Sequence, residues 1–141
     1  MTTSLIRAEQ IVTLDAADTI HAPGYLIVAD ERLVEIGTTY TPGARPIDQE
    51  IDLGARLVMP GLVNAHTHTP MSLFRGHAEG RTLFTLEGWF NTIRVLEQVL
   101  TPDLIPAGVA VSCAEMIRTG TTCFADQYFW MDRIVPVVRR S

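Results

Sequence analysis

The feature that most constrains how this chain can fold is a change of hydrophobic pattern at Pro60-Gly61. Before this break, short apolar and β-branched runs alternate with turn residues at spacings of about 8 to 12 residues, a pattern typical of an all-β unit. After it, an apolar run is followed by stretches whose apolar residues recur at helical spacing. The sequence therefore predicts two parts, residues 1–59 and residues 60–141.

The first part is predicted to be a small β-sandwich. Its strands are expected to be separated by turn signals such as Pro23-Gly24 and Pro42-Gly43. So short a unit buries too little surface to be stable alone, and we expect it to depend on the rest of the protein. The expected strands are Leu5–Leu14, Tyr25–Ala29, Arg32–Ile36, Ile47–Leu53 and Leu57–Met59.

The second part has the order strand, helix, strand, helix. Residues 62–66 have apolar side chains at both odd and even positions, as in a parallel strand covered on both faces. Helices are expected over 83–100 and 101–118, then a second buried strand over 121–125 and a helix capped by Asp132. This order indicates an α/β fold, and we predict the start of a (β/α)8 TIM-type barrel. Because a whole barrel needs about 250 residues, the chain is expected to be a fragment.

Composition narrows the classes of function. The chain is 47% hydrophobic and 19% charged, which is typical of a globular protein. A net charge of -5 without Lys/Arg clusters argues against nucleic-acid or membrane partners and favours a small-molecule substrate. No apolar run approaches a membrane span and residues 1–4 do not resemble a signal peptide, so we expect a cytoplasmic protein. Cys113 and Cys123 are interpreted as reduced core residues.

His66 and His68 are the candidate metal ligands. Two residues apart on a strand, they point to the same face with Cα atoms about 6.6 Å apart. Neutral imidazoles bind Zn²⁺ or Fe²⁺, although two of them do not complete a tight site. A His-x-His pair is a weak pattern by itself, but here it ends an apolar strand and precedes Thr69-Pro70, where strand pairing stops.

The segment Val58–His68, followed by Met71–Gly76, resembles the amidohydrolase superfamily. The resemblance is to its branch of cytosine, guanine, methylthioadenosine/S-adenosylhomocysteine and chlorotriazine hydrolases. Ala114–Arg118 and Gly120–Asp126 are similar to the second helix and strand of the same group, so the resemblance covers nearly the whole chain.

The resemblance implies a (β/α)8 barrel flanked by a β-sandwich built from both chain ends, with one divalent metal, Zn or alternatively Fe. His66 and His68 correspond to the first two ligands of that metal. The family's remaining ligands and its acid/base residues lie on later strands, so no catalytic residue is expected in this chain. The isolated chain is expected to be inactive, and the complete protein is expected to be a homo-oligomer.

The implied activity is hydrolytic deamination of an aminated heterocycle, a purine nucleoside of the methylthioadenosine/S-adenosylhomocysteine type. Within the same class, a triazine, guanine or pterin amidohydrolase is the alternative. An alternative of another class is a non-catalytic fragment that needs a missing segment or a companion chain.

Three residues are candidates for substrate binding. Glu97, eight residues after Trp89, resembles a family Glu that contacts ribose hydroxyls, and its alternative is an exposed helical Glu without a ligand. Gln127 follows the second strand and either meets a polar heterocycle, as in triazine hydrolases, or caps a loop. It stands where many purine-nucleoside deaminases have Met. His77 is expected to be solvated or to lie behind the ligands.

Overall fold

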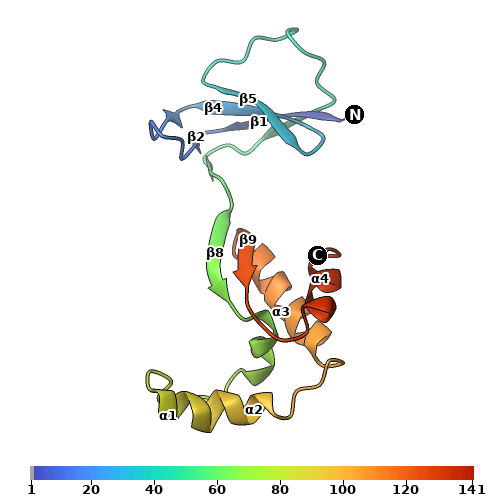
Figure 1. The fold of residues 1–141 in the computed structure, drawn as a ribbon. Helices are drawn as coiled ribbons and strands as arrows, with labels where there is room; N and C mark the ends of the chain where they lie inside the picture. The colour runs from blue at the N-terminus through green and yellow to red at the C-terminus, as the bar shows by residue number, and fades with distance from the viewer. Residues whose placement is uncertain (1) are drawn as a thin grey trace. The chain divides into compact units, whose positions relative to one another are not determined.

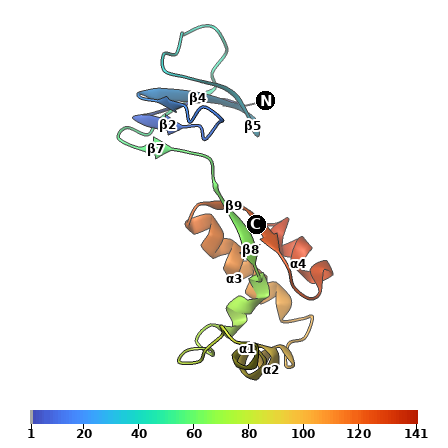
Figure 2. The same ribbon diagram turned by 60° about the vertical axis from the view of Figure 1, so that its left-hand side comes forward.

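A computed structural model describes residues 2–141, which form two compact units, the first ending at Pro60 and the second spanning Gly61–Ser141 (Figures 1 and 2). Each unit has its own apolar cores, so each is described separately. Together they make a mixed α/β chain.

Two small sheets make up the first unit. Strands β1 and β4 pair antiparallel and β1 also pairs parallel with β6, within a sheet of order β5-β4-β1-β6. The second sheet has the order β3-β2-β7. The strands are β1 (Thr3–Ala8), β2 (Gln10–Val12), β3 (Ile20–His21), β4 (Gly24–Ala29), β5 (Arg32–Gly37), β6 (Gln49–Asp52) and β7 (Leu57–Val58).

The prediction of one continuous strand over Leu5–Leu14 is wrong. The chain leaves the first sheet at Glu9, whose amide donates to the Gly54 carbonyl at 3.0 Å, and β2 then joins the other sheet. Leu14 lies outside β2 with a φ of 54°, in the left-handed region. The other expected strands are present, with β6 and β7 shorter than predicted.

Strand β4 has buried apolar side chains on both of its faces. Tyr25 and Ile27 pack with Leu5, whereas Leu26, on the opposite face, packs with Ile11. Leu5, Ile27 and Ile11 are almost fully buried. Strand β4 is therefore covered on both sides by residues of its own unit, whereas β5 and β6 at the sheet edges are mostly exposed.

The second unit has the predicted order of strand, helices, strand and helix. Its parallel strands β8 and β9 pair with each other, and helix α3 packs between the 3₁₀ turn η1 and helix α4 around a core that includes Ile105, Val109 and Ile134 (Figure 1). Its elements are β8 (Leu62–Thr67), η1 (Thr69–Phe74), α1 (Leu86–Trp89), the π-helical turn η2 (Phe90–Arg94), α2 (Val95–Glu97), α3 (Ile105–Arg118), β9 (Thr121–Asp126) and α4 (Met131–Val138).

The helix boundaries differ from the predictions. The helix expected over 83–100 extends only from Leu86 to Glu97 and contains a π turn. Helix α3 begins at Ile105 rather than Thr101, because a longer helix would need a hydrogen bond from Pro106, which has no N–H. Asp132 does not cap α4, since it lies in the first turn after Trp130. The predicted stop of α3 is confirmed at Gly120, which has a φ of 86°.

Strands β8 and β9 are largely exposed, which contradicts their prediction as buried strands. Leu62 and Val63 are 52% and 68% exposed. Each strand has only the other as its sheet neighbour within residues 2–141, and the other described elements leave the side chains of Leu62 and Val63 uncovered. For the same reason Cys123 is exposed and not a core residue as predicted, whereas Cys113 is buried; both cysteines are free.

None of the helices within residues 2–141 is both long enough and apolar enough to cross a bilayer.

Candidate metal centre and adjoining pocket

The two candidate ligands meet at the end of β8. The Nε2 atoms of His66 and His68 lie 3.2 Å apart, and their ring centroids are 5.1 Å apart. His66 is the last residue but one of the strand, and His68 follows it at the start of η1. The His-x-His spacing therefore brings two imidazole nitrogens to one point in space.

The hydrogen bond of His68 fixes which ring nitrogen is free. Its Nδ1 lies 2.6 Å from the main-chain carbonyl oxygen of Gln127, and a carbonyl oxygen only accepts, so Nδ1 carries the proton. In neutral His68, Nε2 then has an unprotonated lone pair, which is the form that binds metals. The same bond orients the ring toward His66.

This geometry suits a divalent metal. Two nitrogens bound tetrahedrally at about 2.0–2.1 Å would be about 3.4 Å apart, close to the separation of the two Nε2 atoms. Within residues 2–141, no group of three or more His, Cys, Asp or Glu side chains could hold a metal ion. Within residues 2–141 the pair therefore offers two imidazole nitrogens at a coordinating separation, without a third such side chain beside them.

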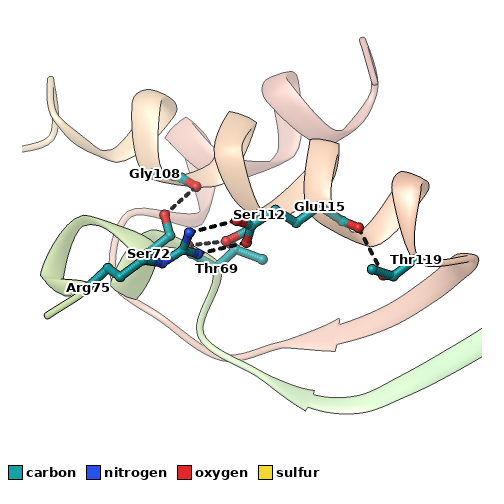
Figure 3. A network of polar contacts seen from close by, with 7 residues as sticks. All are labelled: Thr69, Ser72, Arg75, Gly108, Ser112, Glu115 and Thr119. Carbon is teal, nitrogen blue, oxygen red and sulfur yellow. Dashed lines mark hydrogen bonds and ion pairs between the residues drawn. The ribbon is translucent and has the colours of Figure 1, made fainter. Parts of the chain in front are cut away.

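A polar network fixes the backbone directly after His68. The buried Thr69 donates its amide to Asp126 Oδ1 at 3.1 Å and its hydroxyl to Asp126 Oδ2. Ser112 of α3 donates to the Thr69 carbonyl at 2.8 Å, and Ser72 donates to the Gly108 carbonyl at 2.7 Å (Figure 3). The end of β9 and the middle of α3 thus hold the segment that carries His68.

An ion pair joins the end of η1 to α3 farther along the helix. Arg75 donates to both carboxylate oxygens of Glu115, at 2.7 and 2.8 Å (Figure 3). The hydrogen bonds from Arg75 lower the pKa of Glu115 below its ordinary value. Gly108 is also closely approached, because a Cβ there would lie 2.7 Å from the Pro70 carbonyl oxygen.

A pocket of about 240 Å³ opens beside His68. It brings together all three residues predicted to bind substrate, Trp89, Glu97 and Gln127. His66 does not line it, so the pocket meets the candidate metal pair on the His68 side. Residues that directly follow β8 and β9 and residues of the α1–α2 helix therefore converge on one cavity.

The π turn η2 explains how Trp89 and Glu97 reach the same pocket. Residues eight apart in a regular α-helix differ by about 80° in direction around the axis. A π turn accommodates one extra residue, so the spacing acts like seven residues and the difference falls to about 20°. Because η2 lies between Trp89 and Glu97, it turns both toward the cavity.

Glu97 is not the exposed helical residue of the alternative prediction. Its side chain is only 8% exposed, and its Oε2 accepts a hydrogen bond from Arg94 Nη1 at 2.7 Å. The guanidinium of Arg94 also lies 5.8 Å from the ring centre of Phe129. The pocket therefore contains a nearly buried carboxyl group that is paired with a neighbouring guanidinium.

The family model described as amidohydrolase family matches residues 57–140. The chain belongs to the amidohydrolase family. It is 45% identical, over 91% of its length, to a 5-methylthioadenosine/S-adenosylhomocysteine deaminase of Nitratidesulfovibrio vulgaris (strain DSM 19637 / Miyazaki F), of which it covers 29%. It is 40% identical, over 84% of its length, to a 5'-deoxyadenosine deaminase of Methanothermobacter thermautotrophicus, of which it covers 27%.

Solved structures agree with this assignment. An adenosine deaminase from Xanthomonas campestris with bound zinc superposes on 99% of this amidohydrolase chain, with a TM-score of 0.84 and 30% identity, and the match covers 32% of that protein. An atrazine chlorohydrolase from Arthrobacter aurescens complexed with zinc has a TM-score of 0.82 at 21% identity over 97% of the chain and 33% of its own, which shows the shared fold. The amidohydrolase chain spans about a third or less of the length of these curated and solved relatives.

The sequence did not indicate every residue of the pocket. Met71, Tyr128 and Phe129 also line it in this amidohydrolase. Tyr128 and Phe129 could have been predicted from the sequence, because they closely follow β9. The carboxyl ends of parallel strands meet at one edge of a sheet, where a pocket forms. Burial, and next the nearby Glu97 carboxylate, raise the pKa of Tyr128 well above its ordinary value, so it is a neutral phenol. His77 is exposed and does not line the pocket.

Proposed function

We propose that this chain forms the first part of a (β/α)8 barrel deaminase. The enzyme would hydrolyse the C–N bond that joins the amino group to the purine ring of an adenine nucleoside of the methylthioadenosine or S-adenosylhomocysteine type. Residues 60–141 would begin the barrel, and residues 1–59 would contribute to a flanking β-sandwich. The observation that carries the proposal is the pair of facing His66 and His68 nitrogens beside a pocket with a buried carboxylate, Glu97.

His66 and His68 would hold one divalent metal, for which we propose Zn, with Fe as the alternative. When bound, such a metal supplies the Lewis acidity that activates water near neutral pH. The Gln127 carbonyl keeps His68 in the tautomer that coordinates through Nε2. The remaining ligands and the proton-transferring groups would come from other barrel strands, on the same or a companion chain, and we call that assembly the complete barrel.

The pocket residues would bind the nucleoside. The Glu97 carboxylate can accept hydrogen bonds from two neighbouring sugar hydroxyls, because Arg94 contacts only its Oε2. Trp89 offers an aromatic face to the ligand, and Gln127 offers an amide that can both donate and accept.

Gln127 supports a second candidate function. A neutral amide at the pocket suits a polar heterocycle without a sugar, such as a triazine, guanine or pterin. For such a substrate, Glu97 would have no pair of hydroxyls to bind. A third possibility is that the chain has no catalytic role and needs a missing segment or partner to bind metal tightly.

Metal content and ammonia release test the proposal. In the complete barrel we expect one bound metal per chain and ammonia release from methylthioadenosine, S-adenosylhomocysteine or 5'-deoxyadenosine in preference to guanine or triazines. His66→Ala should remove both metal and activity, whereas His77→Ala, at an exposed histidine outside the pocket, should keep both. Full metal content in His66→Ala, measured by elemental analysis, would contradict ligation by His66.

A further inference from the structure

Tyr128 has a buried hydroxyl without a partner. Within the part of the chain that the structure describes, Tyr128 Oη is inaccessible to solvent and has no partner at full hydrogen-bonding distance and angle, although the Glu97 carboxylate lies near enough to raise its pKa. Buried side-chain polar groups in folded proteins nearly always have a partner, so an exception at a cavity marks a position where a ligand can complete the bonding.

The surroundings of Tyr128 direct this group to the pocket. Its ring centre is 6.2 Å from that of His68 and 5.2 Å from that of Phe129, so the aromatic ring is held between neighbours. The residue follows the end of β9 by two positions and lines the 240 Å³ cavity together with Glu97. The phenol is therefore part of the pocket wall, and its ring is packed against His68 and Phe129.

Tyr128 and Glu97 have complementary hydrogen-bonding capacities. An ionised carboxylate only accepts hydrogen bonds, whereas a phenol has a proton to donate. A ligand hydroxyl has one proton and free lone pairs, so it can donate to Glu97 and accept from Tyr128 at the same time. A hydrocarbon or a halogen at the same place would satisfy neither group.

We propose that Tyr128 is a specificity-determining residue, whose phenol donates a hydrogen bond to the same sugar hydroxyl that donates to Glu97. The proposal rests on the proposed nucleoside-binding function of the pocket. It adds a second group for selecting a hydroxylated sugar, and it explains why the Tyr128 hydroxyl has no hydrogen-bond partner among the described residues.

The test removes only the hydroxyl. Tyr128→Phe in the metal-loaded complete barrel is assayed for ammonia release from adenosine and from 2',3'-dideoxyadenosine. We expect kcat/KM for adenosine to fall about 3- to 10-fold, the effect of one neutral hydrogen bond, with a change of less than about 2-fold for the dideoxy substrate. Equal losses for both substrates, or no loss for either, would overturn the proposal.

Tyr25→Phe is the matched control. The Tyr25 hydroxyl also faces a carboxylate, donating to Glu35 at 2.6 Å, but it lines a different cavity, so its removal should leave the preference for adenosine unchanged. Because Tyr128 Oη bonds to nothing within the described residues, Tyr128→Phe should fold and melt like the wild type. A variant that fails to fold would give the hydroxyl a structural role and overturn the proposal.

Equilibrium binding separates this proposal from the proposed reaction. Inosine, the deamination product, is not turned over, and we expect Tyr128→Phe to bind it about 3- to 10-fold more weakly while 2',3'-dideoxyinosine binds equally to both proteins. If the wild type releases no ammonia from any adenine nucleoside, the proposed reaction fails. The Tyr128 proposal is then decided by binding of adenosine itself: a loss that depends on the sugar hydroxyls supports it, and no such loss overturns it.

Discussion

At the scale of single residues, Glu97 combines features that are costly unless they serve binding. Its carboxylate is 8% exposed, and Arg94 contacts one oxygen of it. The other oxygen of the carboxylate therefore stays available to a ligand. The sequence suggested this role only through resemblance, because helical spacing alone does not predict that the residues at 89 and 97 face one pocket.

The first prediction is that Glu97→Ala lowers kcat/KM for a ribonucleoside by roughly 10- to 150-fold in the complete barrel, because two sugar hydroxyls lose an anionic acceptor worth about 1.5 to 3 kcal/mol. The loss should be much smaller for the 2',3'-dideoxy analogue. Ammonia release measures both, and Glu87→Ala, an exposed Glu at the start of the same helix, is the control. Similar losses for both substrates would remove Glu97 from the sugar site.

The candidate metal pair could be predicted from sequence because strand periodicity alone brings His66 and His68 together. The groups that orient the two imidazoles could not be predicted in this way. The partner of His68 is a main-chain carbonyl 59 positions later in the sequence, and any residue at position 127 offers a carbonyl. Tyr128 was missed for a related reason: an aromatic residue after a strand is equally consistent with ordinary core packing.

At the scale of elements, the segment that carries His68 is held by its attachment to α3. Part of this attachment is electrostatic, through the bidentate pair of Arg75 and Glu115. The lowered pKa of Glu115 makes its contribution dependent on pH.

The second prediction concerns that dependence. Since the folded-state pKa of Glu115 lies below its ordinary value of 4.5, the stabilisation is complete above pH 4.5 and is lost as the pH falls through the folded-state pKa. Glu115→Gln should therefore lower the urea midpoint of the complete barrel at pH 7 but match the wild type at low pH. The control Glu87→Gln should have the same urea midpoint as the wild type at pH 7 and at low pH. A difference in urea midpoint between Glu115→Gln and the wild type that grows as the pH falls would contradict the role of Glu115 in the ion pair.

The helix between Trp89 and Glu97 shows where sequence patterns reach their limit. Apolar residues at helical spacing predicted one regular helix over 83–100, yet the structure contains the π turn η2 at Phe90–Arg94. Apolar periodicity does not reveal a π turn, because a single extra residue inside an α-helix leaves the apolar spacing on either side of it helical.

The third prediction uses this extra residue. Deleting Asn91, an exposed residue of η2, should convert the segment to a regular α-helix and leave Trp89 and Glu97 seven residues apart, still facing the same side. Deleting the exposed Ala110 from the regular helix α3 should instead rotate Val109 and Cys113 out of register by about 100° and disrupt the core. Thermal melting should show the first variant close to wild type and the second severely destabilised. Equal destabilisation would show that η2 does not act as a one-residue insertion.

At the scale of the whole molecule, the sequence predicted the order of elements but not how exposed they would be. The apolar runs of β8 and β9 indicated strands covered on both faces, and Val63 is nevertheless 68% exposed. Such a run records the environment for which the strand is suited, and the described residues do not supply that environment. In the barrel we propose, adjacent strands and helices would provide them.

The last prediction follows from this exposure. If the 141 residues are produced alone, β8 and β9 each have an unpaired edge within the described chain, next to exposed apolar side chains such as Leu62 and Val63. Unpaired edges of this kind form intermolecular sheets, so sedimentation velocity should show concentration-dependent association. Val63→Lys should reduce it by adding a charge to the edge strand, whereas Val99→Lys, at a similarly exposed site (70%) outside both strands, should have less effect. A monodisperse monomer that unfolds cooperatively would mean that the two-stranded sheet is stable without further neighbours, and would argue against the proposed barrel.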